Sequence, residues 1–323
     1  MSKAIGGYFE LELKKVGEYH DSALRLNTAR NAIELVLRLR EYKKVLLPRY
    51  ICSSVLEPIA KLDLSYDFYS IDSNLIPLAS NHYQDTCIIV VNYYGLLESK
   101  IADFCKANLN VIIDNSQAFF SKPDHAIDTV YSPRKFFGVP DGGYLCSSLT
   151  CETNIERDIS YERTTYLLKR IDLSPEEGFE EFRETQKRLS FQPIRRMSRL
   201  TQTLLNSIDY EFVRKRRNEN FSFLHEYLRE KNELTELIEG ETIDGPMVYP
   251  FMTRDSSLRK RLYGNRIYVA TYWNDVIERS DQNSFEWYLT KHLIPLPIDQ
   301  RYAKDEMIRV ARLVERFTSY RNQ

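Results

Sequence analysis

Apolar residues in the first half of the chain alternate between helical spacing and short continuous runs. Residues 32–37 place their apolar members on one helix face, whereas 86–91 and 111–113 are almost wholly apolar. Strands that are apolar on both faces and alternate with helices are typical of a mainly parallel sheet covered by helices. The pattern predicts helices around residues 32–37, 55–59 and 101–107, and strands at 45–48, 64–71, 86–91 and 111–113.

The second half is first helical and highly charged, from about residue 153 to 235, and then alternates again. Residues 208–230 predict a long helix that bridges two lobes, and its charged block 214–219 is most simply a solvated face. We expect a large domain over 1–210, with segment 1–21 packing near the site, and a bridging helix plus small α/β domain over 211–323. The later elements predicted are strands at 247–252, 267–271 and 293–298, and helices at 256–262, 285–292 and 304–317.

Composition narrows the class of protein. The 323 residues carry a formal charge of −1, which argues against a general nucleic-acid binder. No apolar run approaches the roughly 18 residues of a membrane span, and no His/Cys spacing suggests a metal site. An odd number of cysteines without a Cys-x-x-Cys pair fits a reducing compartment, so we expect a cytoplasmic protein. The five cysteines are Cys52, Cys87, Cys105, Cys146 and Cys151.

Candidate chemistry follows the 111–113 run. Asp114 comes directly after that run, Gln117 follows, and Lys135 stands three residues after Ser132. Pyridoxal 5'-phosphate (PLP) chemistry requires a lysine amine for a Schiff base and a carboxylate that keeps the pyridine nitrogen protonated. Asp114 sits where ligands of open α/β sheets bind, at a strand's carboxyl end. The pair Gly142-Gly143 gives the backbone room to pass close to a flat ring.

The remaining polar groups suit the rest of this cofactor. Ser132 can donate to a phosphate, and Gln117 can reach a ring substituent such as the phenolic oxygen. Ala29 and Arg30 open the first amphipathic helix, where N–H groups and the helix dipole favour an anion. Two other interpretations of these residues are less favoured. The β-lactamase signature also begins with Ser-x-x-Lys, but its partner motifs are absent, and Asp114 by itself could be a helix cap.

These motifs resemble the DegT/DnrJ/EryC1/StrS family of sugar aminotransferases, which are fold-type I PLP enzymes. The resemblance spans nearly the whole chain. It implies that Lys135 binds PLP covalently, that Asp114 pairs with the pyridine nitrogen, and that Gln117 contacts the ring oxygen. It also implies that Ser132 and the amides of Ala29 and Arg30 hold the phosphate. The matching segments are 5–11, 29–33, Asp114-x-x-Gln117, the Lys135 segment, 196–198 and 296–297.

The chain departs from the family in places. The spacing from Ser132 to Lys135 is shorter than usual, the chain itself is shorter, and Ile194 stands where a partner-subunit asparagine is expected. Either Tyr50 or Cys52 could stack on the cofactor ring. We count Tyr50 among the predicted cofactor-binding residues, with Cys52 as the alternative for ring stacking.

The resemblance implies a PLP-dependent aminotransferase that acts on a nucleotide-linked keto sugar in amino-sugar or surface-polysaccharide biosynthesis, with glutamate as amino donor. It also implies a homodimer whose sites are completed by the partner subunit. The alternatives are a PLP enzyme of another type, such as a dehydratase, a lyase or a non-sugar transaminase, and an inactive fold-type I binding protein. Substrate contacts are predicted for Tyr8, Arg196, Tyr272 and Trp273.

Overall fold

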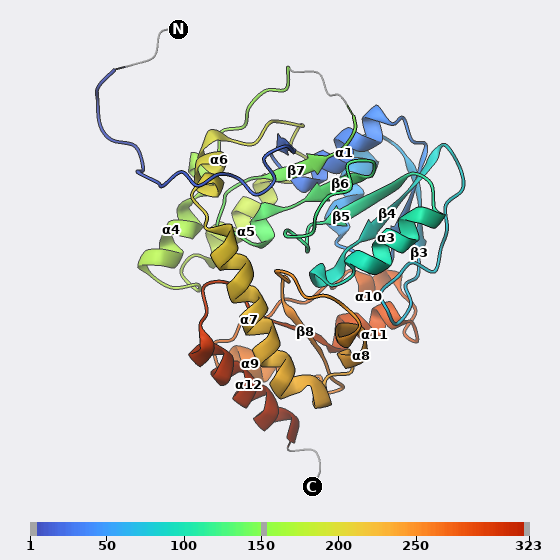
Figure 1. The fold of residues 1–323 in the computed structure, drawn as a ribbon, viewed down its shortest axis with the longest axis vertical. Helices are drawn as coiled ribbons and strands as arrows, with labels where there is room; N and C mark the ends of the chain where they lie inside the picture. Colours follow the sequence, from blue (N-terminus) through green and yellow to red (C-terminus); the bar gives the residue numbers. More distant parts are fainter. Residues whose placement is uncertain (1–4, 150–153, 320–323) are drawn as a thin grey trace.

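The computed structural model describes residues 5–149 and 154–319, and its centre is a seven-stranded sheet (Figure 1). The strand order is β1-β7-β6-β5-β4-β2-β3, and β7 runs antiparallel to both of its neighbours. The remaining neighbouring pairs are parallel. The strands are β1 (Leu24–Leu26), β2 (Lys44–Pro48), β3 (Ser65–Tyr69), β4 (Thr86–Val91), β5 (Val111–Asn115), β6 (Asp128–Tyr131) and β7 (Gly143–Cys146).

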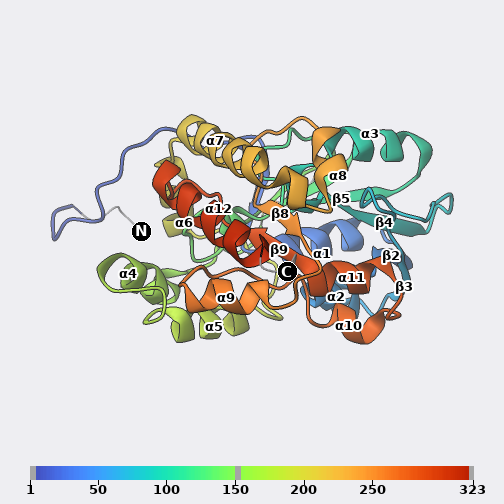
Figure 2. The same cartoon turned by 90° about the horizontal axis from the view of Figure 1, so that it is seen from below.

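Helices cover both faces of this sheet (Figure 2). From β2 the chain crosses outward to β3, and from β4 it crosses in the opposite direction to β5. Because such crossovers are right-handed, their connecting helices lie on opposite faces. Every residue of β4 and β5 is buried, as expected of strands covered on both sides. The helices are α1 (Ala29–Leu39), α2 (Leu56–Lys61) and α3 (Glu98–Ala107), with 3-10 turns η1 (Ser53–Val55), η2 (Tyr93–Gly95) and η3 (Pro133–Lys135).

The rest of the chain is mainly helical and contains a second, two-stranded antiparallel sheet of β8 and β9. Helix α7 runs from the large sheet towards this small lobe, where α12 packs against α7 and α9 (Figure 1). We propose the domain boundary at residues 210 and 211, where α7 begins. The elements are η4 (Tyr161–Arg163), α4 (Thr165–Asp172), α5 (Phe179–Arg188), α6 (Arg199–Asn206), α7 (Tyr210–Leu228), η5 (Arg229–Lys231), α8 (Thr235–Glu239), β8 (Tyr249–Met252), α9 (Leu258–Gly264), α10 (Val276–Arg279), α11 (Phe285–His292), β9 (Leu293–Leu296) and α12 (Lys304–Ser319).

Most predicted elements are confirmed, and two predictions are wrong. Residues 267–271 form no strand, because side chains take up their carbonyl oxygens: Arg259 binds that of Ala270 and Tyr263 that of Val269. The buried Ile267 and Val269 face a cleft between the lobes. Within the charged block 214–219, Arg217 is only 1% exposed, whereas Lys215 is solvated. The pattern did not reveal the short strands β1, β6 and β7 either.

The N-terminal segment extends away from the rest of the molecule (Figure 1). It is tied down near Val16, whose backbone N–H donates to the carbonyl oxygen of Asn206 at 2.7 Å. Before that point Tyr8 is 99% exposed and Phe9 is 91% exposed. Within a single chain, therefore, this part of segment 1–21 does not pack near the predicted site.

Across the described ranges, none of the helices has both the length and the apolar character that crossing a bilayer requires. The same residues contain no cluster of three or more His, Cys, Asp or Glu side chains placed to hold a metal ion. Cys52, Cys87, Cys105 and Cys146 are free thiols, and Cys151 lies outside the described residues.

Candidate active site

A cleft of about 1540 Å³ separates the helices that follow the large sheet from the small lobe, and Lys135 lies on its wall. Its sides come from η3, α4, α5, α7 and α12, and from the segments 263–270 and 297–302. Only two of the basic side chains pair with an acidic one of the cleft: Arg266 with Glu176 at 3.0 Å and Arg301 with Asp299 at 2.7 Å. The lining therefore carries excess positive charge. Its basic members are Arg134, Lys135, Arg170, Arg217, Arg266, Arg301 and Arg309, and its acidic members are Glu176, Asp299 and Glu306.

Lys135 ends the 3-10 turn η3, which follows directly on β6. Its backbone N–H donates to the carbonyl oxygen of Ser132 at 3.2 Å, so the shortened Ser-x-x-Lys spacing forms one tight turn. The side chain is accessible from the cleft, but burial around the amine lowers the pKa of Lys135. Nearby Arg134 and Arg30 lower it further, whereas Cys52 and Asp114 act in the opposite direction. A lysine with a depressed pKa is the form that attacks carbonyl groups.

Asp114 lies near the carboxyl end of β5 and is buried. Its Oδ1 atom accepts a hydrogen bond from the backbone N–H of Ser116 at 2.9 Å. Burial raises the pKa of Asp114, while Ser116 and the charge of Lys135 lower it. The structure thus brings Asp114 and Lys135 within electrostatic range of each other, as the sequence predicted. A cationic ring nitrogen would stabilise the charged carboxylate in this buried position.

Gln117 is held in one orientation by the main chain. Its Oε1 atom accepts a hydrogen bond from the backbone N–H of Tyr94 at 3.0 Å. Tyr94 lies in the left-handed region with φ 61°, which turns its N–H towards this side chain. Since the acceptor of the amide is used, Gln117 has its NH₂ group left to donate. That donor suits a phenolate oxygen on a ring.

The predicted phosphate turn is a capped helix N-terminus. The Oγ1 atom of Thr28 accepts from the Asn31 backbone N–H at 3.1 Å, and the N–H of Arg30 has no intrahelical acceptor. Gly143 packs against this turn, because a Cβ atom there would lie 2.3 Å from the Thr28 carbonyl carbon and 2.4 Å from the Ala29 nitrogen. The Gly-Gly pair is therefore required by the close approach of β7 to its own chain. We had expected it to give room to a ligand ring.

The side chain of Arg30 is engaged elsewhere. Its Nη1 atom pairs with Glu57 at 2.6 Å, and its Nη2 atom donates to the Leu189 carbonyl at 3.0 Å. Only its backbone N–H remains available in the predicted role. Ser132, which caps η3 without using its hydroxyl in the cap, is buried two residues before Arg134.

Tyr50 belongs to a buried aromatic cluster. It is 0% exposed, its hydroxyl lies 3.2 Å from that of Tyr94, and its ring centroid is 5.1 Å from Trp273. Tyr272 packs beside Trp273 with a centroid separation of 5.2 Å. Cys52, in contrast, is half-buried and close enough to Lys135 to influence its pKa. Of the two candidates for ring stacking, this geometry favours Cys52.

None of the four predicted substrate residues lines the cleft, since Tyr272 and Trp273 belong to the aromatic cluster of Tyr50. Tyr8 lies on the exposed N-terminal arm. Arg196 pairs through its backbone with Leu26 and Arg157 in isolated β-bridges. Sequence reasoning also missed Arg217 and Gln300, which both contact the carbonyl oxygen of Phe136. Only the position of Arg217 on the same helix face as Val213, Asn220 and Leu224 could have indicated that it is buried.

Comparison with solved structures identifies the fold. A DegT DnrJ EryC1 StrS aminotransferase from Brucella abortus matches with a TM-score of 0.62 at 14% identity, over 94% of this chain and 87% of that one. The sugar aminotransferase CalS13 from Micromonospora echinospora gives 0.60 at 15% identity, over 93% and 88%. PseC from Helicobacter pylori, an aminotransferase involved in the biosynthesis of pseudoaminic acid, gives 0.61 at 14% identity, over 91% and 86%.

The chain has the fold of these aminotransferases. The fold-type I architecture expected from the sequence is therefore confirmed. No protein-family model matches the sequence, and no curated protein does either. Because a fold can host unrelated functions, the activity has to be argued from the site.

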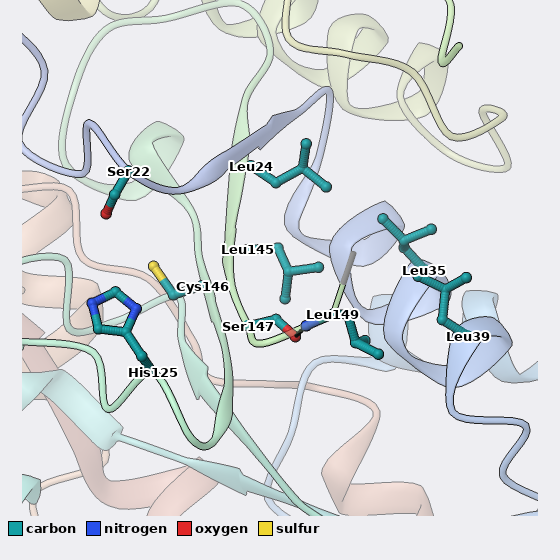
Figure 3. A pocket seen from close by; sticks show the side chains of 9 residues that line it. All are labelled: Ser22, Leu24, Leu35, Leu39, His125, Leu145, Cys146, Ser147 and Leu149. Carbon is teal, nitrogen blue, oxygen red and sulfur yellow. Dashed lines mark hydrogen bonds between the residues drawn. The ribbon is translucent and has the colours of Figure 1, made fainter. Parts of the chain in front are cut away.

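A second, smaller pocket of about 140 Å³ lies between β1, β7 and α1 (Figure 3). Five leucines supply most of its lining, with His125 and Cys146 on one side. Burial raises the pKa of Cys146 to about 11, so its thiol is not a nucleophile at neutral pH. The pocket contains none of the predicted site residues, and we interpret it as a packing gap beneath the sheet edge.

Proposed function

We propose that this protein is a PLP-dependent aminotransferase. One observation carries the proposal: a lysine with a depressed pKa lies on the wall of a large cleft, within electrostatic range of a buried carboxylate at a strand end. The residues fit the cofactor, since Asp114 can face the ring nitrogen, the NH₂ of Gln117 the phenolate, and Ser132 with the Arg30 N–H the phosphate. We also propose that Cys52, rather than Tyr50, lies against the ring.

The chain's own groups have definite tasks in such a reaction. Bound PLP supplies an electron sink that stabilises negative charge at the substrate Cα. Lys135 first holds the cofactor and then, once displaced, moves a proton between the substrate Cα and the cofactor C4'. Asp114 keeps the ring nitrogen protonated. Gln117 fixes the ring orientation through its bond to Tyr94.

For the substrate, we propose a keto sugar carried on a nucleotide, with glutamate as the amino donor, in amino-sugar or surface-polysaccharide biosynthesis. The excess of basic over acidic side chains in the cleft supports an anionic substrate, because arginines suit diphosphates. The related folds of sugar aminotransferases support the sugar. Free thiols agree with the cytoplasm as the location.

We further propose that the active form is a homodimer. The exposed arm bears large apolar residues, and its stretch 9–13 alternates apolar and polar positions as a half-buried strand does. Helices α4 and α5 and their flanks expose a second apolar surface. Exposed apolar residues gathered on one surface are typical of an interface. Its members are Ile159, Leu168, Ile171, Leu173, Phe179, Phe182 and Phe191.

Borohydride reduction of the protein loaded with PLP tests the function. A pyridoxyl group on Lys135 is the expected result, and Lys122→Arg, at an exposed lysine, should not change the labelling. A label on another lysine, or no label, would refute the cofactor role. Supplying amino donors with nucleotide-linked keto sugars then separates amino transfer from elimination or lyase chemistry on the same cofactor.

A further inference from the structure

Arg134, the residue directly before Lys135, has a half-buried side chain whose positive charge lacks an ion-pair partner among the described residues. Its Nε atom is buried and has no hydrogen-bond partner in the part of the chain that the structure describes. Among the ion pairs of those residues, none includes Arg134. The guanidinium nevertheless belongs to the lining of the cleft, next to Lys135.

The groups around Arg134 do not neutralise it. The carboxylate of Asp141 is already held by the Ser198 backbone N–H at 2.9 Å, by the Ser198 hydroxyl at 2.7 Å and by Thr201. The Tyr166 hydroxyl forms a hydrogen bond with the Arg134 side chain, but it is neutral. Arg30 adds a second positive charge, and burial together with Arg30 lowers the pKa of Arg134.

A buried charge without a counter-ion is unfavourable unless a ligand compensates for it. The planar fork of a guanidinium binds phosphate oxygens in pairs. Arg134 therefore has the chemistry of an anion site that is completed when its ligand binds.

The position of Arg134 indicates which anion. Turn η3 meets the start of α1 through the Gly142-Gly143 pair: a Cβ on Gly142 would lie 2.9 Å from Pro133, and one on Gly143 would lie 2.3 Å from Thr28. Arg134 is thus beside the helix N-terminus and the Ser132 hydroxyl proposed for the phosphate.

We propose that Arg134 binds the phosphate of PLP, together with Ser132 and the N-terminus of α1. This inference rests on the proposed function. Arg134 supplies a charge-assisted contact to the phosphate, and its placement next to Lys135 couples phosphate binding to the position of the reactive amine.

Comparing PLP with pyridoxal, which lacks the phosphate, tests this role. Arg134→Met should weaken PLP binding about 10- to 100-fold, as expected for hydrogen bonds to a charged group. Attachment of pyridoxal to Lys135 should weaken less than that of PLP, because it needs no phosphate contact and loses only the charge that helps to lower the pKa of Lys135. The ³¹P resonance of bound PLP should also shift in the variant. Arg134→Lys keeps the charge but loses the planar fork, so its affinity for PLP should lie between that of the wild type and that of Arg134→Met.

Arg183→Met is the matched control, because the Arg183 side chain is 55% exposed on α5 and lies outside the cleft lining. It should bind PLP like the wild type. An equal loss of PLP and pyridoxal binding in Arg134→Met, or unchanged PLP binding, would overturn the phosphate role alone. If the wild type does not attach PLP to Lys135 at all, the proposed function fails with it.

Discussion

The side chain of Gln300 donates a hydrogen bond of 2.8 Å to the carbonyl oxygen of Phe136, the residue that follows Lys135. Arg217 of α7 donates to the same oxygen at 3.5 Å and to Gln300 Oε1 at 3.2 Å, and its guanidinium lies 4.5 Å from the centroid of the Phe136 ring. The bridging helix and the small lobe therefore both hold the segment that carries the reactive lysine.

Replacing Arg217 should destabilise the protein strongly. Its guanidinium also donates to the carbonyls of Pro246 and Met247 at 3.0 and 3.1 Å, so Arg217→Met leaves several buried acceptors without donors. We expect a loss of about 2–4 kcal/mol in the free energy of unfolding, measured by urea titration. Lys215→Met, in the same charged block but exposed, should change it by less than about 0.5 kcal/mol. Equal stabilities of the two variants would contradict the role of Arg217.

Asp114→Asn should leave the stability of the fold unchanged and lower the rate of amino transfer. Because burial raises the pKa of Asp114, its ionised form is disfavoured in the folded state, and a neutral amide of the same shape should not lower stability at pH 7. Amino transfer should fall at least about 100-fold, since the protonated ring nitrogen loses its partner. Activity within about tenfold of the wild type in stopped assays would rule out this pairing.

The buried His20 should make stability depend on pH. Its Nε2–H donates a hydrogen bond of 2.8 Å to the Phe119 carbonyl oxygen, and burial lowers the pKa of His20 to about 4 from the ordinary 6.5. The unfolded chain therefore binds the proton more readily, so stability is lost as the pH falls from 6.5 towards 4. The expected loss is about 2 kcal/mol between pH 7 and pH 5. His20→Phe should abolish this part of the dependence, and an unchanged pH profile would contradict it.

Bound PLP should protect the thiol of Cys52 from alkylation. Burial raises the pKa of Cys105 and Cys146 to about 11 and raises that of Cys87 as well, so these thiols should react slowly with iodoacetamide. Cys52 should be alkylated before them, and PLP should slow its alkylation at least about fivefold while leaving Cys105 unaffected. Peptide mapping by mass spectrometry measures both rates. No protection of Cys52 would return Tyr50 as the ring-stacking candidate.

The N-terminal arm should contribute to dimer formation. Replacing Tyr8 and Phe9 with serine removes two large exposed apolar side chains, and we expect dimer affinity to fall at least about tenfold in light scattering on dilution. Leu78→Ser, at an exposed leucine on the large domain, is the control. Mixing Lys135→Ala with Arg196→Ala protein asks whether sites are shared, since recovered activity requires residues from both subunits. A protein that is monomeric and active would end the proposal.

The sequence by itself determined the layered α/β architecture and the positions of Asp114 and Lys135 within it. The apolar runs at 86–91 and 111–113 can only be buried between two helix layers, so β4 and β5 followed from local pattern. The placement of Asp114 at a strand end and Lys135 in a tight turn after β6 is equally local. For these residues, chain position and secondary structure decide the geometry.

Only the tertiary structure decided which groups the charged side chains and the glycines contact. Arg217 reads as one member of a solvated charged block, but the Phe136 carbonyl and Gln300 that bind it come from distant parts of the chain. The Gly142-Gly143 pair serves a contact with Thr28, more than a hundred residues earlier. Residues 267–271 alternate like a strand yet pair with none, because the Arg259 guanidinium binds both the Ala270 carbonyl and the carbonyl of Leu293 in β9. Periodicity records which side chains avoid water, whereas the group that meets each of them depends on the packing of segments far apart in sequence.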